Sequence, residues 1–421
     1  MNGYFYRYRD EDKDISMQKR DERKKMGLLR RFFSLKLWTV LQWLIAVPLA
    51  VVLIFSMTKI PVLSAVNILT MFTYHVSIWT MAVLVVSLLL YLTKKSKPRR
   101  FVLWASAVAL ACSFIISGSL TGLALKEGAQ INFGEALTFR LNFAPDVEVE
   151  DSYSYDGENI GLSVWTPKNT DRKPAPIFVY IHGGGWASGD RHGYAAGHCK
   201  YFSDHGYLAI SINYPLSTKD RHLWDKQEEC IGYSFDWIAK HAEEYGGDID
   251  NLFVGGESAG GNLAINVSTR INSGEIGKLI GKELPPIKAI APLFPGVDPA
   301  AVYNENDPLY RTGQQELLKF HFGGSPEEYP ERYAKITSSN IVDEKYTPPM
   351  MLMYAGNDHY VPGKSIRDFI DALNEKGITN KVVVVPFSDH VFNLIPGVIG
   401  GQIYEQVSCK WFEQYLGEGK A

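Results

Sequence analysis

The sequence predicts an α/β domain, with a mostly parallel sheet and helices on both faces, behind an all-α membrane segment of three helices. Two observations predict this arrangement. Within a chain of 421 residues, the first 125 hold three long stretches without a charged residue. In the remainder, short apolar strands alternate with helical patterns, which is typical of a parallel sheet that is covered on both faces.

Charge and cysteine content exclude several classes of function. Acidic residues number 46 and basic residues 43, for a formal net charge of -3, so no basic excess points to a nucleic-acid partner. The cysteines at positions 112, 199, 230 and 409 form no CxxC pair, and no zinc or thioredoxin-type signature is present. Cys112 lies in an apolar stretch. The other three could be buried thiols or include one disulfide.

Residues 37–125 are interpreted as a transmembrane region. The three stretches lie at about 37–57, 69–92 and 101–124. Each provides the roughly 20 apolar residues that a helix needs to cross a hydrocarbon core of about 30 Å. Helices of soluble proteins keep a polar face, which argues against a large buried helical core. The pattern also argues against a cleavable signal peptide, because the first stretch starts too late and two more follow it.

Basic residues predict the orientation of these spans. Lys and Arg crowd the charged N-terminal segment 1–36 and the link 94–100, whereas the link between the first two spans carries Lys59 alone. The positive-inside rule therefore makes the N-terminus cytoplasmic, and three spans place the C-terminal domain on the extracytoplasmic side. If the middle stretch is re-entrant, that domain is cytoplasmic instead. Within this stretch, His75 is either a functional group or a neutral side chain on the bundle interior.

The α/β domain is predicted at 145–421, after a linker at 126–144. It opens with a hairpin whose turn is Asp156-Gly157, a dipeptide typical of tight hairpins. The later strands are expected at 177–181, 207–213, 252–255, 287–293, 350–354 and 381–385. The helices are expected near 195–205, 225–245, 259–272, 363–377 and 402–416. The stretch 297–347 breaks this alternation and is interpreted as a lid-like insertion, with a helical piece at 314–320.

One motif places a serine between a strand and a helix. Gly256-Glu257-Ser258-Ala259-Gly260 matches the pattern G-x-S-x-G. It follows an expected strand and precedes an expected helix, which is the setting of a nucleophile elbow. The flanking glycines permit a sharp turn that lifts the Ser258 hydroxyl out of the sheet. The pattern alone is weak, because a structural serine in a glycine-rich turn would look the same.

A second glycine-rich motif follows an earlier strand and reads His182-Gly183-Gly184-Gly185-Trp186. Acyl transfer builds negative charge on a carbonyl oxygen, which preorganised backbone N–H groups must meet. Glycine lets the backbone approach a substrate closely. Gly183, Gly184 and Ala259 are therefore the predicted oxyanion donors. His182 is interpreted as a scaffold for this loop, and Trp186 either lines the pocket or packs. The spacing is not the G-x-G-x-x-G of dinucleotide loops.

A serine nucleophile needs a base, and the base needs an acid that fixes its tautomer. In this type of domain the order along the chain is Ser, then Asp or Glu, then His. Asp358 and His390 each follow an expected strand, at the carboxyl ends where open α/β sheets place their sites. The rivals fit less well. His321 lies in the insertion, His359 is adjacent to Asp358, and Asp389 is expected to contact the backbone.

Residues from about 145 to 416 resemble the α/β-hydrolase superfamily. Within it, they resemble the esterase/lipase branch with an HGGGW oxyanion motif, which includes hormone-sensitive-lipase-like and feruloyl-esterase-like proteins. Besides the two glycine motifs, the supporting stretches are Ala187-Ser188-Gly189-Asp190, Asn213-Tyr214-Pro215-Leu216, Tyr245-Gly246-Gly247-Asp248 and Gly261-Asn262. The resemblance implies hydrolysis of carboxylic esters through an acyl-enzyme on Ser258, with no cofactor and no metal. His390 would act as base and Asp358 as its orienting acid.

The chain departs from this branch in two ways. Many relatives carry Asp-Tyr-Arg-Leu where this chain has Asn213-Tyr214-Pro215-Leu216. Hormone-sensitive-lipase-like relatives also build a cap from residues ahead of the first strand, and here that region is membrane. The acyl pocket must then be covered by the insertion, by the spans, or by nothing. Aromatic residues of the insertion could line an aryl or acyl site or serve as packing: Tyr303, Tyr310, Phe320, Phe322, Tyr329 and Tyr333.

The predicted function is a membrane-anchored serine hydrolase of the esterase/lipase type. Its substrate would be a small ester, a lipid or a cell-envelope acyl group. An acyltransferase is an alternative, because a sugar or lipid hydroxyl could replace water at the same triad. A non-catalytic receptor with this fold is another, although such proteins usually lose a triad residue. Neither paired charges nor broken helices support a transporter. The sequence does not predict the oligomeric state.

Overall fold

The computed structural model describes residues 17, 35–138, 147–305 and 307–417. Nearly all of the predicted N-terminal segment 1–36, and residues 139–144 of the predicted linker, lie outside them. The chain divides into two compact units. One consists of Met1–Ile54 and His75–Phe114, and the other of Phe55–Tyr74 and Ile115–Ala421. The second unit therefore combines the α/β domain with segments from the ends of the apolar helices.

Three apolar helices are long and apolar enough to cross a membrane, at Lys36–Ser56, Val66–Thr93 and Lys97–Lys126. The first and third of these are the α-helices α2 (Leu35–Ser56) and α4 (Lys97–Lys126). The middle one agrees with the stretch predicted at 69–92, most of which is α-helical. It consists of a 3₁₀ helix, η1 (Pro61–Phe72), followed by α3 (Thr73–Thr93). Most of the exposed large apolar side chains lie on these helices, as expected of helices that are apolar all round.

Small polar side chains join the helices of the first unit. Gln42 Nε2 donates to the Ser87 hydroxyl at 3.0 Å, and the hydroxyls of Ser87 and Ser106 lie 2.8 Å apart. Arg99 is buried, and its Nε donates to the Thr39 hydroxyl at 2.9 Å. Such bonds between neighbouring helices are typical of helix packing in membranes. His75 lies at the start of α3 and is half-buried.

An eight-stranded sheet forms the centre of the α/β domain, in the order β1-β2-β4-β3-β5-β6-β7-β8. The first three strands in this order pair antiparallel and include the predicted hairpin, and all later pairs are parallel. Every residue of β3, β4, β6 and β7 is buried, as in parallel strands covered on both faces. The strands are β1 (Val149–Tyr155), β2 (Glu158–Trp165), β3 (Ala175–Ile181), β4 (Leu208–Ile212), β5 (Gly247–Glu257), β6 (Ala289–Leu293), β7 (Met350–Ala355) and β8 (Asn380–Val385).

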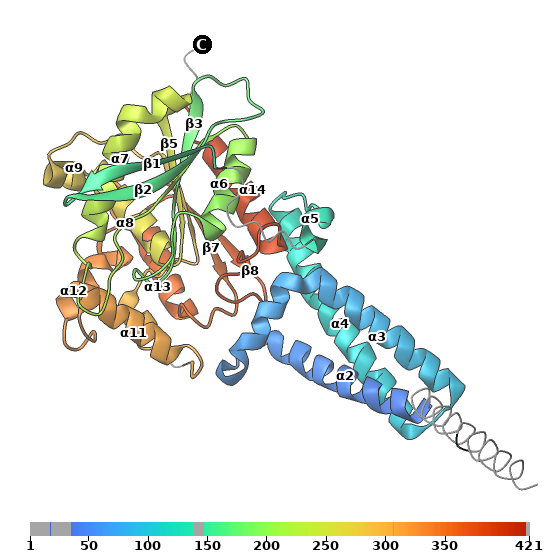
Figure 1. Ribbon diagram of the computed structural model, residues 1–421. Coiled ribbons are helices and arrows are strands. Elements are labelled where there is room, and N and C mark those ends of the chain that lie inside the picture. The colour runs from blue at the N-terminus through green and yellow to red at the C-terminus, as the bar shows by residue number, and fades with distance from the viewer. Residues whose placement is uncertain (1–16, 18–34, 139–146, 306, 418–421) are drawn as a thin grey trace, which may run out of the picture. The chain divides into compact units, whose positions relative to one another are not determined.

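Two groups of helices cover the sheet (Figure 1). One group is α6 (Gly193–Asp204) with α14 (Ile399–Glu413), which contact each other as well as the sheet. The other group is α7 (Gln227–His241) with α8 (Ala259–Asn272), and α8 lies along β5 and β6. The helix that the sequence predicts at 225–245 ends earlier, as α7, and continues as the 3₁₀ helix η2 (Ala242–Tyr245). α9 (Glu275–Ile280) is a short helix that the sequence did not indicate. α13 (Gly363–Glu375) follows β7, where a helix is predicted.

The insertion 297–347 is largely helical. Phe322 and Tyr333 are buried, and their rings stack with centroids 3.7 Å apart. For these two aromatic residues the packing interpretation therefore holds. The insertion's helices are α10 (Pro299–Tyr303), α11 (Arg311–Phe322), α12 (Pro330–Ile336) and the 3₁₀ helix η3 (Ser338–Asn340).

The described part of the predicted linker is attached to the α/β domain. It contains α5 (Phe133–Leu137), and just before it two backbone positions exchange paired hydrogen bonds with side-chain amides of α14. Gln130 bonds to Gln406 through its N–H and its carbonyl, both at 2.7 Å. Asn132 bonds to Gln402 in the same way, at 2.7 and 3.1 Å. The chain that leaves α4 is thus fixed to the domain within a few residues.

The buried side chains settle the cysteine alternatives. All four cysteines are free and buried, so the thiol interpretation holds and no disulfide forms.

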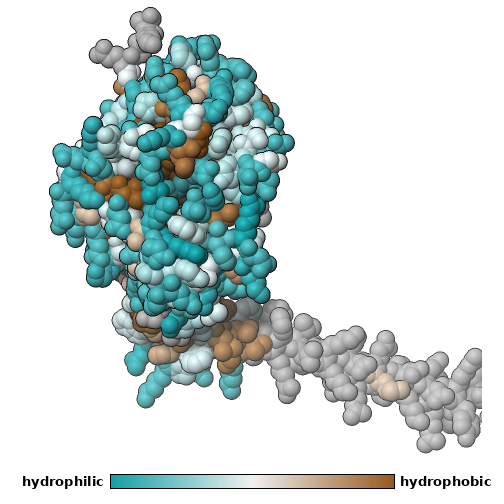
Figure 2. Space-filling model, turned by 90° about the vertical axis from the view of Figure 1, so that its left-hand side faces the viewer, coloured by the Kyte–Doolittle hydropathy of each residue, from teal (hydrophilic) through white to brown (hydrophobic). Residues whose placement is uncertain are grey.

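The face of the molecule in Figure 2 is mainly hydrophilic, with small hydrophobic patches between polar side chains.

Candidate active site

Ser258 occupies the turn between β5 and α8. Its backbone has φ +54° and ψ −119°, which a non-glycine residue adopts only when its surroundings impose it. Gly260 permits this turn, because a Cβ there would lie 2.2 Å from the carbonyl oxygen of Ile181. The sharp strand-to-helix turn that the motif predicts is therefore present. It leaves Ser258 half-buried at the carboxyl end of the sheet.

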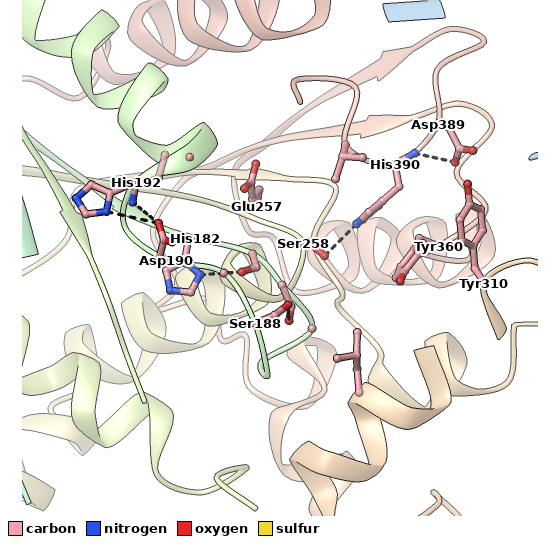
Figure 3. A pocket seen from close by; sticks show the side chains of 18 of the residues that line it. His182, Ser188, Asp190, His192, Glu257, Ser258, Tyr310, Tyr360, Asp389 and His390 are labelled. Carbon is pink, nitrogen blue, oxygen red and sulfur yellow. Dashed lines mark hydrogen bonds and ion pairs between the residues drawn. The ribbon is translucent and has the colours of Figure 1, made fainter. Parts of the chain in front are cut away.

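His390 and Asp358 lie in line with the serine hydroxyl. His390 Nε2 is 3.0 Å from Ser258 Oγ (Figure 3). On the other side of the ring, His390 Nδ1 is 2.9 Å from Asp358 Oδ2. The other carboxylate oxygen, Oδ1, accepts the N–H groups of Tyr360 at 2.8 Å and Val361 at 2.7 Å. Because the carboxylate accepts a hydrogen bond from Nδ1–H, Nε2 of the neutral ring is left as an acceptor toward Ser258.

The surroundings of His390 favour its charged form. Burial lowers the pKa of His390, but the charge and hydrogen bond of Asp358, with smaller effects from Asp389 and Glu257, raise it. The net pKa lies above the ordinary value of 6.5. A raised pKa means that the surroundings stabilise the imidazolium that forms when the ring removes a proton from a hydroxyl.

A second histidine–carboxylate pair crosses the first. Asp389 Oδ2 lies 2.9 Å from His359 Nδ1. Its Oδ1 accepts the backbone N–H groups of His359 at 2.8 Å and His390 at 2.7 Å. The prediction that Asp389 contacts the backbone is confirmed, but its bond to His359 was missed. The available signal was the repeated Asp-His dipeptide after β7 and after β8. The crossing ties these two loops together.

The glycine loop after β3 lies against Ser258. A Cβ at Gly183 would be 3.2 Å from Ser258 Cβ, and one at Gly185 would be 2.9 Å from Leu317 Cδ1. Gly184 has φ +119°, and a Cβ there would collide with the Ser188 carbonyl oxygen at 2.1 Å. Larger side chains are thus excluded at these three glycines, and their backbone lines the pocket beside the serine. Ala259 follows the serine as the first residue of α8.

His182 and Trp186, at the two ends of this loop, are both buried. His182 Nδ1 donates to the Gly183 carbonyl at 2.7 Å, and its ring stacks on Tyr214 at 4.4 Å. Burial lowers the pKa of His182 to about 4, so the ring is neutral at pH 7. Trp186 stacks on His321 at 5.2 Å. Of its two interpretations, packing holds, because among the described residues the pocket lining does not include it.

Glu257, the residue before the serine, reaches into a buried polar cluster. Its Oε2 accepts from Asn393 Nδ2 at 2.8 Å and from the Tyr180 hydroxyl at 3.2 Å. Asn393 lies on the chain just after His390. This bond therefore links the turn that carries the serine to the loop that carries the histidine.

A pocket of about 550 Å³ surrounds Ser258. In Figure 3, Asp190 and His192 lie on one side of the serine, and Tyr310 and Tyr360 on the other. Of the aromatic residues singled out in the insertion, Tyr310 is the one that lines the pocket among the described residues. Within the described part of the chain, no group of three His, Cys, Asp or Glu side chains is arranged to hold a metal ion. The lining is Ile68, His182, Gly183, Gly184, Gly185, Ser188, Gly189, Asp190, His192, Gly193, Ala195, Glu257, Ser258, Tyr310, Leu317, Tyr360, Asp389, His390 and Val391.

Comparison with known sequences identifies a family. The BD-FAE family profile matches residues 162–373. The probable carboxylic ester hydrolase LipM of Mycobacterium tuberculosis is 25% identical over 258 residues, which are 60% of this chain and 58% of LipM. Esterase LipQ of the same organism is 23% identical over 258 residues, with 61% of this chain and 60% of LipQ covered. The chain thus spans about three fifths of the length of these relatives.

Comparison with solved structures identifies the fold. Esterase B from Lactobacillus rhamnosis superposes with a TM-score of 0.52 at 22% identity, covering 71% of this chain and 94% of that one. A hyperthermophilic esterase from Pyrobaculum calidifontis gives a TM-score of 0.53 at 18% identity, covering 71% of this chain and 92% of that one. These likenesses establish the α/β-hydrolase fold that the sequence predicts.

Proposed function

The chain belongs to the BD-FAE family, and from that premise we propose that it is a carboxylic ester hydrolase of the esterase/lipase type. One observation carries the proposal. Ser258 Oγ, His390 and Asp358 form a continuous hydrogen-bonded path, with distances of 3.0 and 2.9 Å. A hydroxyl, a base and an orienting acid in this order are what acyl transfer through serine requires.

In the proposed reaction, His390 Nε2 removes the Ser258 proton while Oγ attacks the ester carbonyl. Asp358 holds the ring and stabilises its positive charge, and the raised pKa of His390 supports this role. The imidazolium then gives its proton to the departing alcohol, which leaves an acyl group on Ser258. Water, activated by the neutral ring, releases the acid and restores the serine.

The proposed oxyanion donors are the N–H groups of Gly183, Gly184 and Ala259. Gly183 and Gly184 line the pocket beside Ser258, and at these two glycines no side chain shields the backbone from the pocket. Ala259 N–H lies at the start of α8, where helix N-termini favour negative charge. Loss of one such donor costs about 3–4 kcal/mol in the transition state. His182, Gly185, Trp186 and Glu257 support this geometry.

The same proposal assigns parts of the chain. Residues 145–421 are the catalytic domain, and the insertion 297–347 covers its pocket through Tyr310 and Leu317, which line it.

The three apolar helices at 37–125 anchor the catalytic domain in a membrane, as part of a multi-pass protein. Basic residues at 1–36 and 94–100 favour a cytoplasmic N-terminus and an extracytoplasmic catalytic domain. Protease protection in sealed vesicles of known orientation tests this sidedness, and cleavage of the domain from the cytoplasmic face contradicts it.

Nitrophenyl ester hydrolysis by the full chain in detergent tests the catalytic proposal. Ser258→Ala should lower kcat/KM by about 10⁴-fold or more. Ser273→Ala, a matched change at an exposed serine of the same domain, should leave turnover at the parent level. A well-folded parent that neither turns over any ester nor reacts with a fluorophosphonate contradicts the proposal.

A further inference from the structure

One residue of the pocket wall comes from the membrane region. Ile68 lines the pocket with Ser258, and it lies in η1, close to the start of the second candidate span. We propose that η1 forms an acyl-binding wall of the site, and that the substrate is an amphiphilic ester of medium or long acyl chain that reaches Ser258 from the membrane surface. The inference rests on the proposed ester hydrolysis and names its class of substrate.

The length of α3 indicates that η1 lies at the membrane boundary. α3 has 21 residues, which at 1.5 Å per residue span about 31 Å. That length alone crosses a hydrocarbon core of about 30 Å. η1 is therefore not needed to cross the membrane, although it contains no charged residue. Ile60 and Ile68 are 38% and 45% exposed. An uncharged segment with exposed apolar side chains between the α-helices α2 and α3 suits the lipid interface.

η1 lies within the link 57–73, which joins α2 to α3. Both ends of this link are bonded to the compact unit that holds the site. Asn357, the residue before Asp358, donates from Nδ2 to the carbonyl of Ser56 at 3.4 Å. At the other end, the Tyr74 hydroxyl lies 3.0 Å from that of Thr121, and its ring packs on Phe133 at 5.2 Å. The link 57–73 thus runs from the loop of the acid to the end of α4. It belongs to one unit with the pocket.

The pocket lining suits an amphiphilic substrate, because it contains both aliphatic and polar side chains. Ile68, Leu317 and Val391 are aliphatic, and an acyl chain gains from each methylene that it buries against such side chains. Ser188, Asp190 and His192 line the pocket as well, and they offer hydrogen bonds to a polar alcohol portion. A short soluble ester would use the polar residues and the serine, but it would leave the aliphatic wall unfilled.

Acyl-chain selectivity tests the wall. The full chain in lipid nanodiscs is compared with Ile68→Trp, which narrows the pocket, and with Ile60→Trp. The control changes the same residue type in the same link, at a position outside the pocket lining. We expect the ratio of kcat/KM for nitrophenyl decanoate to that for nitrophenyl acetate to fall about tenfold in Ile68→Trp. In Ile60→Trp the ratio should stay at the parent value. The same ratio in all three proteins overturns the inference.

A second readout separates this inference from the proposed ester hydrolysis. The labelling rates of Ser258 by dodecyl and ethyl fluorophosphonates need no turnover, and their ratio should fall in Ile68→Trp alone. A parent that labels but hydrolyses no ester contradicts ester hydrolysis and still tests the wall. A parent that neither labels nor hydrolyses overturns both.

Surface dilution tests the route of the substrate. A long-chain fluorogenic ester is held at one bulk concentration while the lipid that surrounds the full chain is increased. If the ester arrives from the membrane, its hydrolysis rate should follow its mole fraction in the lipid and fall as lipid is added. A rate that follows the bulk concentration alone overturns the membrane route.

Discussion

Two histidine–carboxylate pairs occupy the loops after β7 and β8, and they differ in what the second ring nitrogen meets. In the pair Asp358–His390, Nε2 faces Ser258 at 3.0 Å. In the pair Asp389–His359, Nε2 is buried and meets no hydrogen-bond partner within the described residues. The two Nδ1 distances to the carboxylates are both 2.9 Å. Position relative to the serine, rather than the chemistry of the pair, therefore distinguishes the proposed base from its neighbour.

The two carboxylates are also equally engaged. Asp358 accepts from His390 Nδ1 and from two backbone N–H groups, and Asp389 accepts from His359 Nδ1 and from two more. Each pair should therefore contribute to stability by a similar amount. Only the first pair should contribute to catalysis, and the predictions below test this separation.

The largest difference is expected between the two histidines. His390→Gln removes the proposed base and should lower kcat for a nitrophenyl ester by about 10⁴-fold or more. His359→Gln should cost less than about tenfold, because the ring reaches neither substrate nor serine. Steady-state kinetics of the two purified variants check this. Equal losses would show that the second pair takes part in the chemistry.

The two acids should differ by somewhat less. Asp358→Asn keeps the shape but loses the charge and the acceptor that fix the tautomer of His390, so kcat should fall by about 10³-fold or more. Asp389→Asn retains an oxygen for the two backbone N–H groups and should cost about tenfold or less. Turnover measured at several pH values separates lost orientation from a shifted ionisation. A greater loss in Asp389→Asn would reverse the assignment of the acid.

Stability should not distinguish the pairs. Asp358→Ala and Asp389→Ala each leave two backbone N–H groups and a histidine without their acceptor, in sites that are 3% and 8% exposed. Each change should lower the free energy of unfolding by about 2–3 kcal/mol. Thermal unfolding of the full chain, followed by tryptophan fluorescence, measures both. A large loss in one variant alone would mean that one pair carries the fold by itself.

The smallest expected effect is on pH dependence. The neutral form of His390 is the proposed base, and its pKa is raised, so kcat/KM should rise with pH through a pKa above 6.5. In Asp358→Asn the charge that raises this pKa most is gone while burial remains, so the rise of kcat/KM should move to lower pH. His359→Gln should leave this rise in place. A rise that shifts in His359→Gln instead would assign the ionisation to the second pair.

The strand ends and the order of the site residues could be predicted from the sequence. Ser258 lies in a local strand–turn–helix pattern, and Asp358 and His390 follow strands whose apolar runs are continuous. Parallel strands bring their carboxyl ends to one edge of the sheet, so residues far apart in the chain meet without further information. The packing of Trp186 was open because local sequence does not show what lies opposite a side chain, here His321 in the insertion.

What could not be predicted depends on tertiary pairing. The bond of His359 to Asp389 arises because two loops cross, and the dipeptides alone do not show which histidine pairs with which acid. Ile68 is an ordinary apolar residue of a membrane stretch, and its place in the pocket depends on how the link 57–73 folds back onto the domain. The 3₁₀ helix that carries it lies mostly ahead of the span predicted at 69–92, and its apolar composition alone does not distinguish it from a span.

The most direct test of the account is to find the acyl group. The full chain is mixed with a nitrophenyl ester, quenched in acid within the first turnovers, digested, and examined by peptide mass spectrometry. The account predicts an acyl group on the peptide that contains Ser258, present in the parent and absent in His390→Gln. Ester turnover by the parent with no acyl group on Ser258, or with one on another residue, would contradict it.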